Sequence, residues 1–366
     1  MVCHTQVTLR STWTALIRAG AITCPFLSLY LLAAVYVRCF GCRLPGDTMW
    51  HERLEFSLSC AMSDSPLLLL GAGPVALNVA SLVAGHRKVY GTTRQPQRIF
   101  QLAQAKIEPV VMPLPSTEII APLASGADVL VSFPPDGATD AVLAPSCNLA
   151  RSLVYISSTR VYGSYQGQID NTTPVDWQEP SAQQRLNAET VWRAAGATIL
   201  RVAGIYGPHS GLLKRLQDGT YKITDDSYRI ISRIHIADLA EIILALLERG
   251  QTSRTYVCAD LHPSSQLEVV EWLCQHLALP LPAEQGEESS EEEVAAEQQQ
   301  QQQPEQGKQQ HRKPTTEQRA TVSHKVRNDR LVDSGGLLSD LGITLRYPTY
   351  KEGYIDCLQS GNSCQS

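Results

Sequence analysis

The chain has 366 residues, 43% of them hydrophobic, and a formal net charge of -5 at pH 7. This length suffices for one large α/β domain with a smaller lobe, and the lack of a basic excess argues against a nucleic-acid-binding protein. Of the ten cysteines, the five that follow Met62 are scattered without disulfide-like spacing, which favours a reducing compartment. Cys39 and Cys42 form a C-x-x-C pair, but no second pair or histidine set accompanies them, so we expect no metal site.

The first 63 residues differ in composition from the rest of the chain. Residues 1–46 contain arginines but no Asp or Glu, and the mostly apolar residues 19–37 are long enough for one membrane span. The same composition suits a peptide that directs the chain to a plastid or mitochondrion. A third alternative is that the working protein begins at Met62. We favour an organellar or cytoplasmic location over a membrane anchor, and expect residues 1–63 to lie outside the fold.

Residues 65–94 predict a strand, a glycine turn, a helix and a second strand. The unbroken apolar run from Leu67 to Leu70 is typical of a strand buried on both faces of a parallel sheet. Apolar positions between residues 75 and 83 indicate a packed helix, and residues 89–92 have the composition of the next strand. This βαβ order is the unit that places a dinucleotide pyrophosphate at a helix N-terminus.

The turn within this unit has the spacing G-x-G-x-x-A. Gly71 allows a tight turn, Gly73 lets the backbone approach phosphates, and the small Ala76 lets the helix pack closely on the strand. Pro74 and Val75 begin the helix, where proline is tolerated because no amide hydrogen is needed. We therefore expect Gly71, Gly73, Pro74 and Val75 to bind a dinucleotide.

The end of the second strand bears on which dinucleotide is bound. NAD sites usually carry an acidic residue there for the ribose hydroxyls, whereas this chain has Thr92, Thr93 and Arg94 and no carboxylate before Glu108. Arg94 can pair with a 2′-phosphate and the threonines can donate hydrogen bonds to it, so NADP is favoured over NAD. The alternative is that Arg94 is a solvated cation at the start of a helix.

The following elements alternate as in a doubly wound α/β fold, with a parallel Rossmann sheet. The fourth strand covers residues 127–133, and we expect Ser132 to Pro134, at its end, to line the adenosine half of the cofactor site. We expect a loop over the site at residues 166–178 and a hairpin at residues 221–231. The helices expected after Arg94 cover residues 95–105, 139–149, 181–195, 211–218, 236–248 and 266–277, and the strands cover 108–112, 127–133, 153–158, 197–202 and 255–260.

Several later motifs, taken in order, resemble the extended short-chain dehydrogenase/reductases, the NAD-dependent epimerase/dehydratase family. They are S-S-T-R-V-Y-G at 157–163, L-R-V-A-G-I-Y-G-P at 200–208, S-R-I-H-I-A-D-L-A at 232–240, and the closing segments 325–328 and 346–353. The resemblance implies a Rossmann sheet with a small C-terminal substrate lobe, an NADP or NAD cofactor with Tyr206 near it, a hydroxyl/carbonyl substrate such as a sugar nucleotide, and a possible homodimer.

The resemblance also implies a catalytic set, and here the chain departs from it. The family uses a tyrosine, a lysine four residues later, and a Ser/Thr that holds the substrate oxygen, a position matched by Ser158. R-L-N-A-E at 185–189 matches the family's K-L-x-A-E, which places Ser181 at the tyrosine and Arg185 at the lysine. An alcohol has a pKa far above the ~10 of tyrosine, and arginine stays charged, although Arg185 can still bind ribose hydroxyls.

The missing proton donor leaves two functions open. One is an oxidoreductase or epimerase with an altered active site; the other is an inactive NADP-binding sensor or assembly subunit. We take His235 as a capping or packing residue. Candidate replacements for the donor are Tyr162, Tyr165, Asp170 and His209, each with a structural alternative, such as a place in the V-Y-G turn for Tyr162.

A Glu/Gln-rich tract interrupts the later part of the chain. Residues 283–323 contain almost nothing apolar, so we expect a disordered insertion. The expected organisation is therefore residues 1–63 outside the fold, 64–282 as the Rossmann core with the start of the substrate lobe, 283–323 as the insertion, and 324–366 as the rest of the lobe and a tail.

Overall fold

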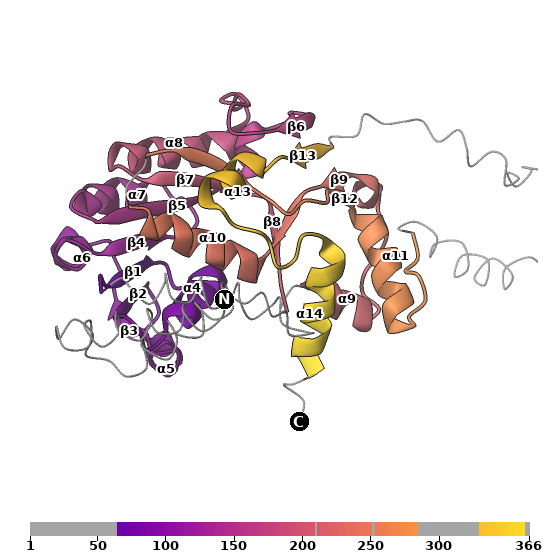
Figure 1. Cartoon of the computed structure of the whole chain (residues 1–366), viewed down its shortest axis with the longest axis horizontal. Helices are drawn as coiled ribbons and strands as arrows, with labels where there is room; N and C mark the ends of the chain where they lie inside the picture. Colours follow the sequence, from indigo (N-terminus) through magenta and orange to yellow (C-terminus); the bar gives the residue numbers. More distant parts are fainter. Residues whose placement is uncertain (1–63, 209–210, 251–252, 285–328, 363–366) are drawn as a thin grey trace, which may run out of the picture. The chain divides into compact units, whose positions relative to one another are not determined.

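The computed structural model describes residues 64–208, 211–250, 253–284 and 329–362, and its main element is a seven-stranded parallel sheet (Figure 1). The expectations for residues 1–63, His209, residues 325–328 and most of the insertion lie outside the described residues. The strands, in their order across the sheet, are β3 (Glu108–Val111), β2 (Val89–Thr93), β1 (Leu67–Leu70), β4 (Asp128–Val131), β5 (Ser152–Ser158), β7 (Thr198–Val202) and β11 (Thr255–Cys258).

The strand order reverses between β1 and β4. The chain runs from β1 outward to β3 and then returns to the other side of β1, so this edge of the sheet is a topological switch point, where ligands of open α/β sheets bind. Leu70 of β1 is in register with Val131 of β4, which brings Gly71 and Ser132 to the same level of the crevice. The doubly wound Rossmann fold predicted from the sequence is confirmed.

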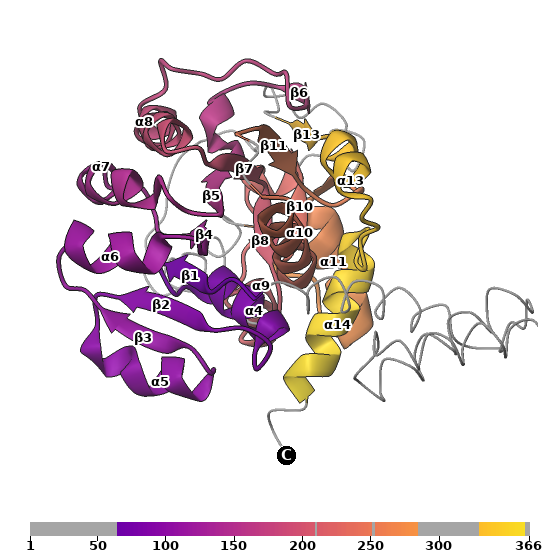
Figure 2. The ribbon, with the colours of Figure 1, turned by 60° about the vertical axis from the view of Figure 1, so that its left-hand side comes forward.

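Helices cover both faces of the sheet, which explains why β1 is apolar throughout: Leu67 to Leu70 have no exposed surface. On one face α4 packs against α10, and on the other α6, α7 and α8 lie in a row (Figure 2). The helices flanking the sheet are α4 (Pro74–Val83), α5 (Ile99–Gln104), α6 (Thr117–Ala124), α7 (Ala138–Leu143), α8 (Pro180–Ala194) and α10 (Ile236–Glu248).

A smaller lobe follows β7 and has its own apolar core, which includes Tyr206, Leu216, Leu273 and Tyr354. Its helices are α9 (Gly211–Gln217), α11 (Gln266–Leu277) and α14 (Tyr350–Asn362), whereas α13 (Gly335–Leu341) packs against α10 and β11. Three short strand pairs accompany them: β8 (Gly204–Tyr206) with β10 (Arg233–His235), β9 (Ile230–Ile231) with β12 (Ser264–Ser265), and β6 (Gly167–Ile169) with β13 (Arg330–Val332). Within the described ranges, no helix combines the length and apolar character needed to cross a bilayer.

Three sequence expectations differ from the structure. The hairpin at 221–231 is wrong, because residues 225–228 form a 3₁₀ turn and β9 pairs with the distant β12. The helix expected at 139–149 ends as an α-helix at Leu143 and continues as a 3₁₀ turn, since Pro145 has no amide hydrogen to donate. The loop at 166–178 contains the short strand β6, which pairs with β13 from much later in the chain.

Candidate functional site at the switch point

The turn after β1 depends on Gly71. Its φ of 90° lies in the region that favours glycine, and a Cβ at this position would be 2.9 Å from the backbone nitrogen of Phe133. The Gly71 N–H donates to Oγ1 of Thr92 at 2.8 Å, and the Ser132 hydroxyl donates to the Gly71 carbonyl. The turn is therefore held between the ends of β2 and β4.

The start of α4 faces open space. Gly73 is the N-cap, Pro74 is the first helical residue, and no atom lies within 4 Å of a Cβ built on Gly73. The first amides of an α-helix, here those of Val75 and Ala76, have no acceptor within the helix and carry its positive dipole end. Because Ala76 is fully buried against the sheet, the helix lies close to β1. This arrangement suits a bound anionic group such as a phosphate.

A cavity of about 490 Å³, here called the switch-point cavity, lies at the carboxyl ends of β1, β2 and β4. Its volume is within the range of about 300–1,000 Å³ typical of small-molecule sites. Of the predicted cofactor residues, those that line it are Gly71, Gly73, Thr93, Arg94 and Ser132. Tyr206 does not line it, because its ring packs 4.8 Å from that of Tyr354 in the small lobe.

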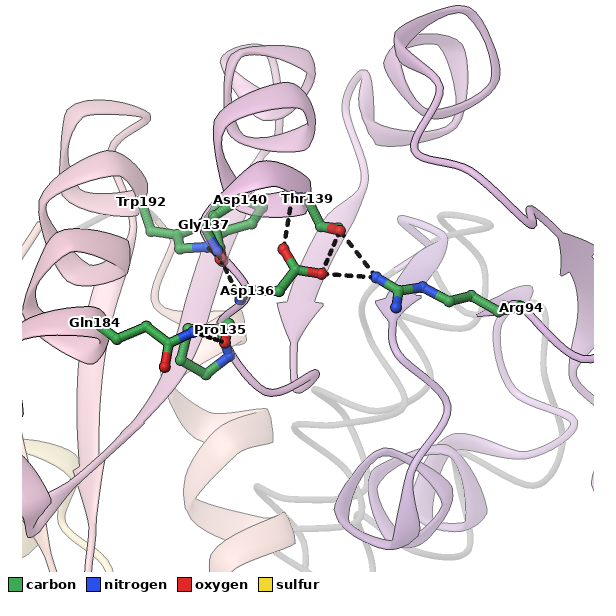
Figure 3. Close-up of polar contacts among 8 residues, drawn as sticks. All are labelled: Arg94, Pro135, Asp136, Gly137, Thr139, Asp140, Gln184 and Trp192. Atoms are coloured by element: carbon green, nitrogen blue, oxygen red, sulfur yellow. Dashed lines mark hydrogen bonds and ion pairs between the residues drawn. The ribbon is translucent and has the colours of Figure 1, made fainter. Parts of the chain in front are cut away.

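Arg94 is held by the loop that follows β4 (Figure 3). Its guanidinium lies 2.9 Å from Oδ2 of Asp136 and donates to Oγ1 of Thr139, also at 2.9 Å. Thr139 donates to Asp136 from its amide and its hydroxyl, both at 2.7 Å. Partial burial alone would raise the pKa of Asp136, but the hydrogen bonds from Thr139 and Arg94 outweigh it and lower the pKa below its usual value.

The β4–α7 loop (residues 132–137) is held by side chains of α7 and α8 (Figure 3). Asp140, which is fully buried, accepts a hydrogen bond from Nε1 of Trp192 at 2.7 Å and two more from the amides of Asp136 and Gly137 at 3.2 Å. Nε2 of Gln184 on α8 donates to the Pro135 carbonyl at 2.9 Å. Asp136 thus lies in a loop that is held by residues of α7 and α8.

The predicted substrate-orienting residue lies at the same edge of the sheet. Val131 of β4 is in register with Tyr155 of β5, so Ser158 is a few residues beyond the level of the glycine turn and two strands away. At about 4.8 Å per strand the lateral separation is about 10 Å. Ser158 Oγ accepts from the Arg160 amide at 3.3 Å, which caps the 3₁₀ turn at Thr159–Tyr162.

Tyr162, the second predicted catalytic residue, has no exposed surface. Its hydroxyl accepts from Nη1 of Arg201 at 3.1 Å, and burial raises its pKa although the Arg201 charge opposes this. Such a hydroxyl is neither accessible nor easily ionised, so the geometry fits the structural alternative. Arg201 also pairs with the buried Glu189 of the R-L-N-A-E motif, at 2.8 Å, and the Ser157 hydroxyl donates to Glu189.

The start of α8 holds the two substituted positions. The Ser181 hydroxyl donates to Glu179, which caps the helix by accepting from the Ala182 amide at 2.8 Å. Arg185 is half-buried one turn further on. Burial raises the pKa of Tyr155, and the nearby positive charge of Arg185 opposes this rise. The Tyr155 hydroxyl is buried without a hydrogen-bond partner among the described residues, a feature that the sequence reading did not single out.

Of the remaining donor candidates, Asp170 is tied into a local turn, whereas Tyr165 is 38% exposed. Asp170 accepts from the Thr172 hydroxyl and from the amides of Thr172 and Thr173; these hydrogen bonds lower its pKa and close a turn. His235 is buried and caps α10 by accepting from the Ala237 amide at 3.4 Å. Burial lowers the His235 pKa to about 4. The capping role expected for His235 is confirmed.

Comparison with known proteins agrees with this architecture. Residues 139–259 match the model described as the NAD dependent epimerase/dehydratase family. This part of the chain therefore resembles members of that family. Over 118 residues it is 31% identical to Protein YeeZ of Escherichia coli, a match that covers 31% of this chain and 41% of that protein.

Solved structures with a similar fold cover most of the chain. One is a functionally unknown conserved protein from Silicibacter pomeroyi, with a TM-score of 0.62 and 24% identity over 82% of this chain and 99% of that one. Another is MoeE5 in complex with UDP-glucose and NAD, with a TM-score of 0.60 and 16% identity over 82% of this chain and all of that one (100%). At these identities the likeness establishes the fold.

Proposed function

We propose that the chain binds NAD in the switch-point cavity and is an oxidoreductase or epimerase acting on a hydroxyl/carbonyl substrate of the sugar-nucleotide type. The observation that carries this proposal is the open cavity bounded by Gly71, Gly73 and the N-terminus of α4 at the strand-order reversal. The family match and the NAD and UDP-glucose bound by MoeE5 support it.

The residues present fit a dinucleotide at this place. The free amides at the start of α4 would bind the pyrophosphate, and the residues that end β2 and β4 would surround the adenosine half. A bound nicotinamide supplies hydride transfer. Ser158 would orient the substrate oxygen and Arg185 would hold the ribose hydroxyls, without exchanging a proton, since its guanidinium stays charged.

A second function is favoured by the start of α8. Ser181 stands where the resemblance expects the proton-exchanging tyrosine, and its hydroxyl is already bonded to Glu179. Tyr162 is buried. The alternative is therefore a protein that binds the dinucleotide without turnover and serves as a sensor or assembly subunit. The homodimer that the resemblance implies is compatible with both alternatives. The molecular mass of the full chain, measured by light scattering, tests it.

The test has two stages. Fluorescence titration of the full chain with NADH should give saturable binding, and Gly73→Asp, which adds a negative charge at the helix N-terminus, should abolish it. Absence of binding by the folded protein overturns the proposal. Incubation with UDP-sugars then separates the alternatives: turnover of bound NAD supports the enzyme, and tight binding with no turnover across a broad screen supports the sensor.

A further inference from the structure

The adenosine end of the switch-point cavity contains a carboxylate, that of Asp136, which is far in sequence from the other residues of this end. In a Rossmann site the adenosine ribose lies beyond the end of the second strand, where NAD sites present an acidic side chain. This chain has Thr93 and Arg94 there. Asp136, which comes from the β4–α7 loop 42 residues later, lies against Arg94 and lines the same cavity.

The Arg94–Asp136 pair is open to the cavity rather than buried. The two side chains are 61% and 39% exposed, so a ligand can reach them. Asp136 accepts three hydrogen bonds, two from Thr139 and one from Arg94. A carboxylate has about four acceptor positions, so one remains for a ribose hydroxyl.

A 2′-phosphate meets different conditions at the same place. It carries a charge of about -1.5 to -2 at neutral pH and would approach the Asp136 carboxylate as well as the Arg94 guanidinium. To use Arg94 fully it must break the ion pair and leave Asp136 without its cation. Asp136 cannot retreat easily, because Asp140 and Gln184 fix the loop that bears it. A ribose diol instead donates to Asp136 and leaves the pair intact.

We propose that Asp136, paired with Arg94, determines cofactor specificity by accepting a ribose hydroxyl of NAD and repelling the 2′-phosphate of NADP. This inference rests on the proposed function, since it concerns the same cavity. It favours NAD, whereas residues 92–94 taken alone favour NADP, and the difference between the two expectations is Asp136.

The experiment is a parallel titration of the full chain with NADH and NADPH. The unmodified protein should bind NADH more tightly. Asp136→Asn removes the negative charge and keeps the shape, so the ratio of the two dissociation constants should move toward NADPH by roughly tenfold, the effect of one charge-assisted hydrogen bond. Asp136→Ser is the second variant, and thermal melting checks that each variant folds.

A matched control is available on the far side of the molecule. Arg254 and Asp340 form an ion pair of the same length, 2.9 Å, with side chains 62% and 41% exposed. Asp340→Asn should therefore leave the NADH/NADPH ratio unchanged.

The outcomes separate this inference from the proposed function. If the folded, unmodified protein binds neither dinucleotide, the proposed function fails and the inference fails with it. If it binds NADH but binds NADPH as tightly or more tightly, the inference alone is overturned. A ratio that does not move in the folded Asp136 variants, or that moves equally in Asp340→Asn, also overturns it.

Discussion

Two stretches of the sheet's carboxyl edge, one around β1, β2 and β4 and the other around β5 and α8, use their polar groups differently. In the first, the turn at Gly71 and the start of α4 leave backbone amides facing a cavity. In the second, three hydroxyls at the expected catalytic positions already have partners: Ser158 caps a turn, Ser181 bonds Glu179, and Tyr162 bonds Arg201.

The difference shows which parts of this fold tolerate sequence change. A phosphate site made from backbone amides needs only a glycine turn and a helix N-terminus, and this chain has such a turn at Gly71. Proton exchange needs one side chain with a suitable pKa, and a single substitution such as serine for tyrosine removes it. The four predictions below test this contrast, from the largest expected effect to the smallest.

Restoring the expected pair should have the largest effect. Ser181→Tyr combined with Arg185→Lys should raise turnover of a UDP-sugar by about 10²–10⁴, the usual contribution of general acid–base catalysis. The matched control is Ser181→Phe with Arg185→Lys, which adds the ring without the hydroxyl and should give no gain. Equal rates for the two double variants would show that turnover is not limited by the missing proton donor.

The buried ion pair beneath α8 should matter most for stability. Glu189→Gln leaves Arg201, which is 7% exposed, without its carboxylate partner, and should lower the free energy of unfolding by about 3–5 kcal/mol in urea titration. The control is Glu108→Gln on the exposed pair with Lys88, which should leave the free energy of unfolding nearly unchanged. A small loss in the first variant would mean that α8 is held mainly by apolar packing.

The glycine turn should respond in binding as well as in stability. Gly71→Ala places a Cβ against the Phe133 backbone at a positive φ, and should cost about 1–3 kcal/mol and lose NADH binding. Gly126→Ala has a similar φ of 70° but meets no atom within 4 Å, so it should reduce stability slightly and leave binding intact. Wild-type affinity in the Gly71 variant would show that the turn is not part of the binding site.

The smallest effect is a pH dependence at the end of β11. Burial raises the pKa of Asp260 to about 7, and its Oδ2 has no hydrogen-bond partner among the described residues. Because the folded-state pKa lies above the unfolded value of 3.8, the stabilisation is complete below pH 4 and is lost as the pH rises through 7. Asn cannot ionise, so Asp260→Asn should remove this residue's contribution to the stability lost between pH 4 and 8. An unchanged pH profile of the melting temperature would contradict this.

Much of the fold followed from local patterns. The apolar run of β1 and the glycine spacing after it are contiguous in the chain and predict the turn directly. The features that were missed join distant segments: Asp136 reaches Arg94 from another crossover, and Arg201 contacts Tyr162 and Glu189 from β7. Tyr206 was expected near the cofactor, but it packs in the core of the small lobe, a placement that no local pattern signals.

The hydrogen bond from Gln184 to the Pro135 carbonyl connects the two stretches directly. It joins the loop that carries Asp136 to the helical turn between Ser181 and Arg185. Gln184 is exposed and is not one of the residues expected to contact the cofactor or substrate. Gln184→Ala would therefore remove this direct link between the loop and α8 while leaving the glycine turn, Ser158 and Arg185 in place.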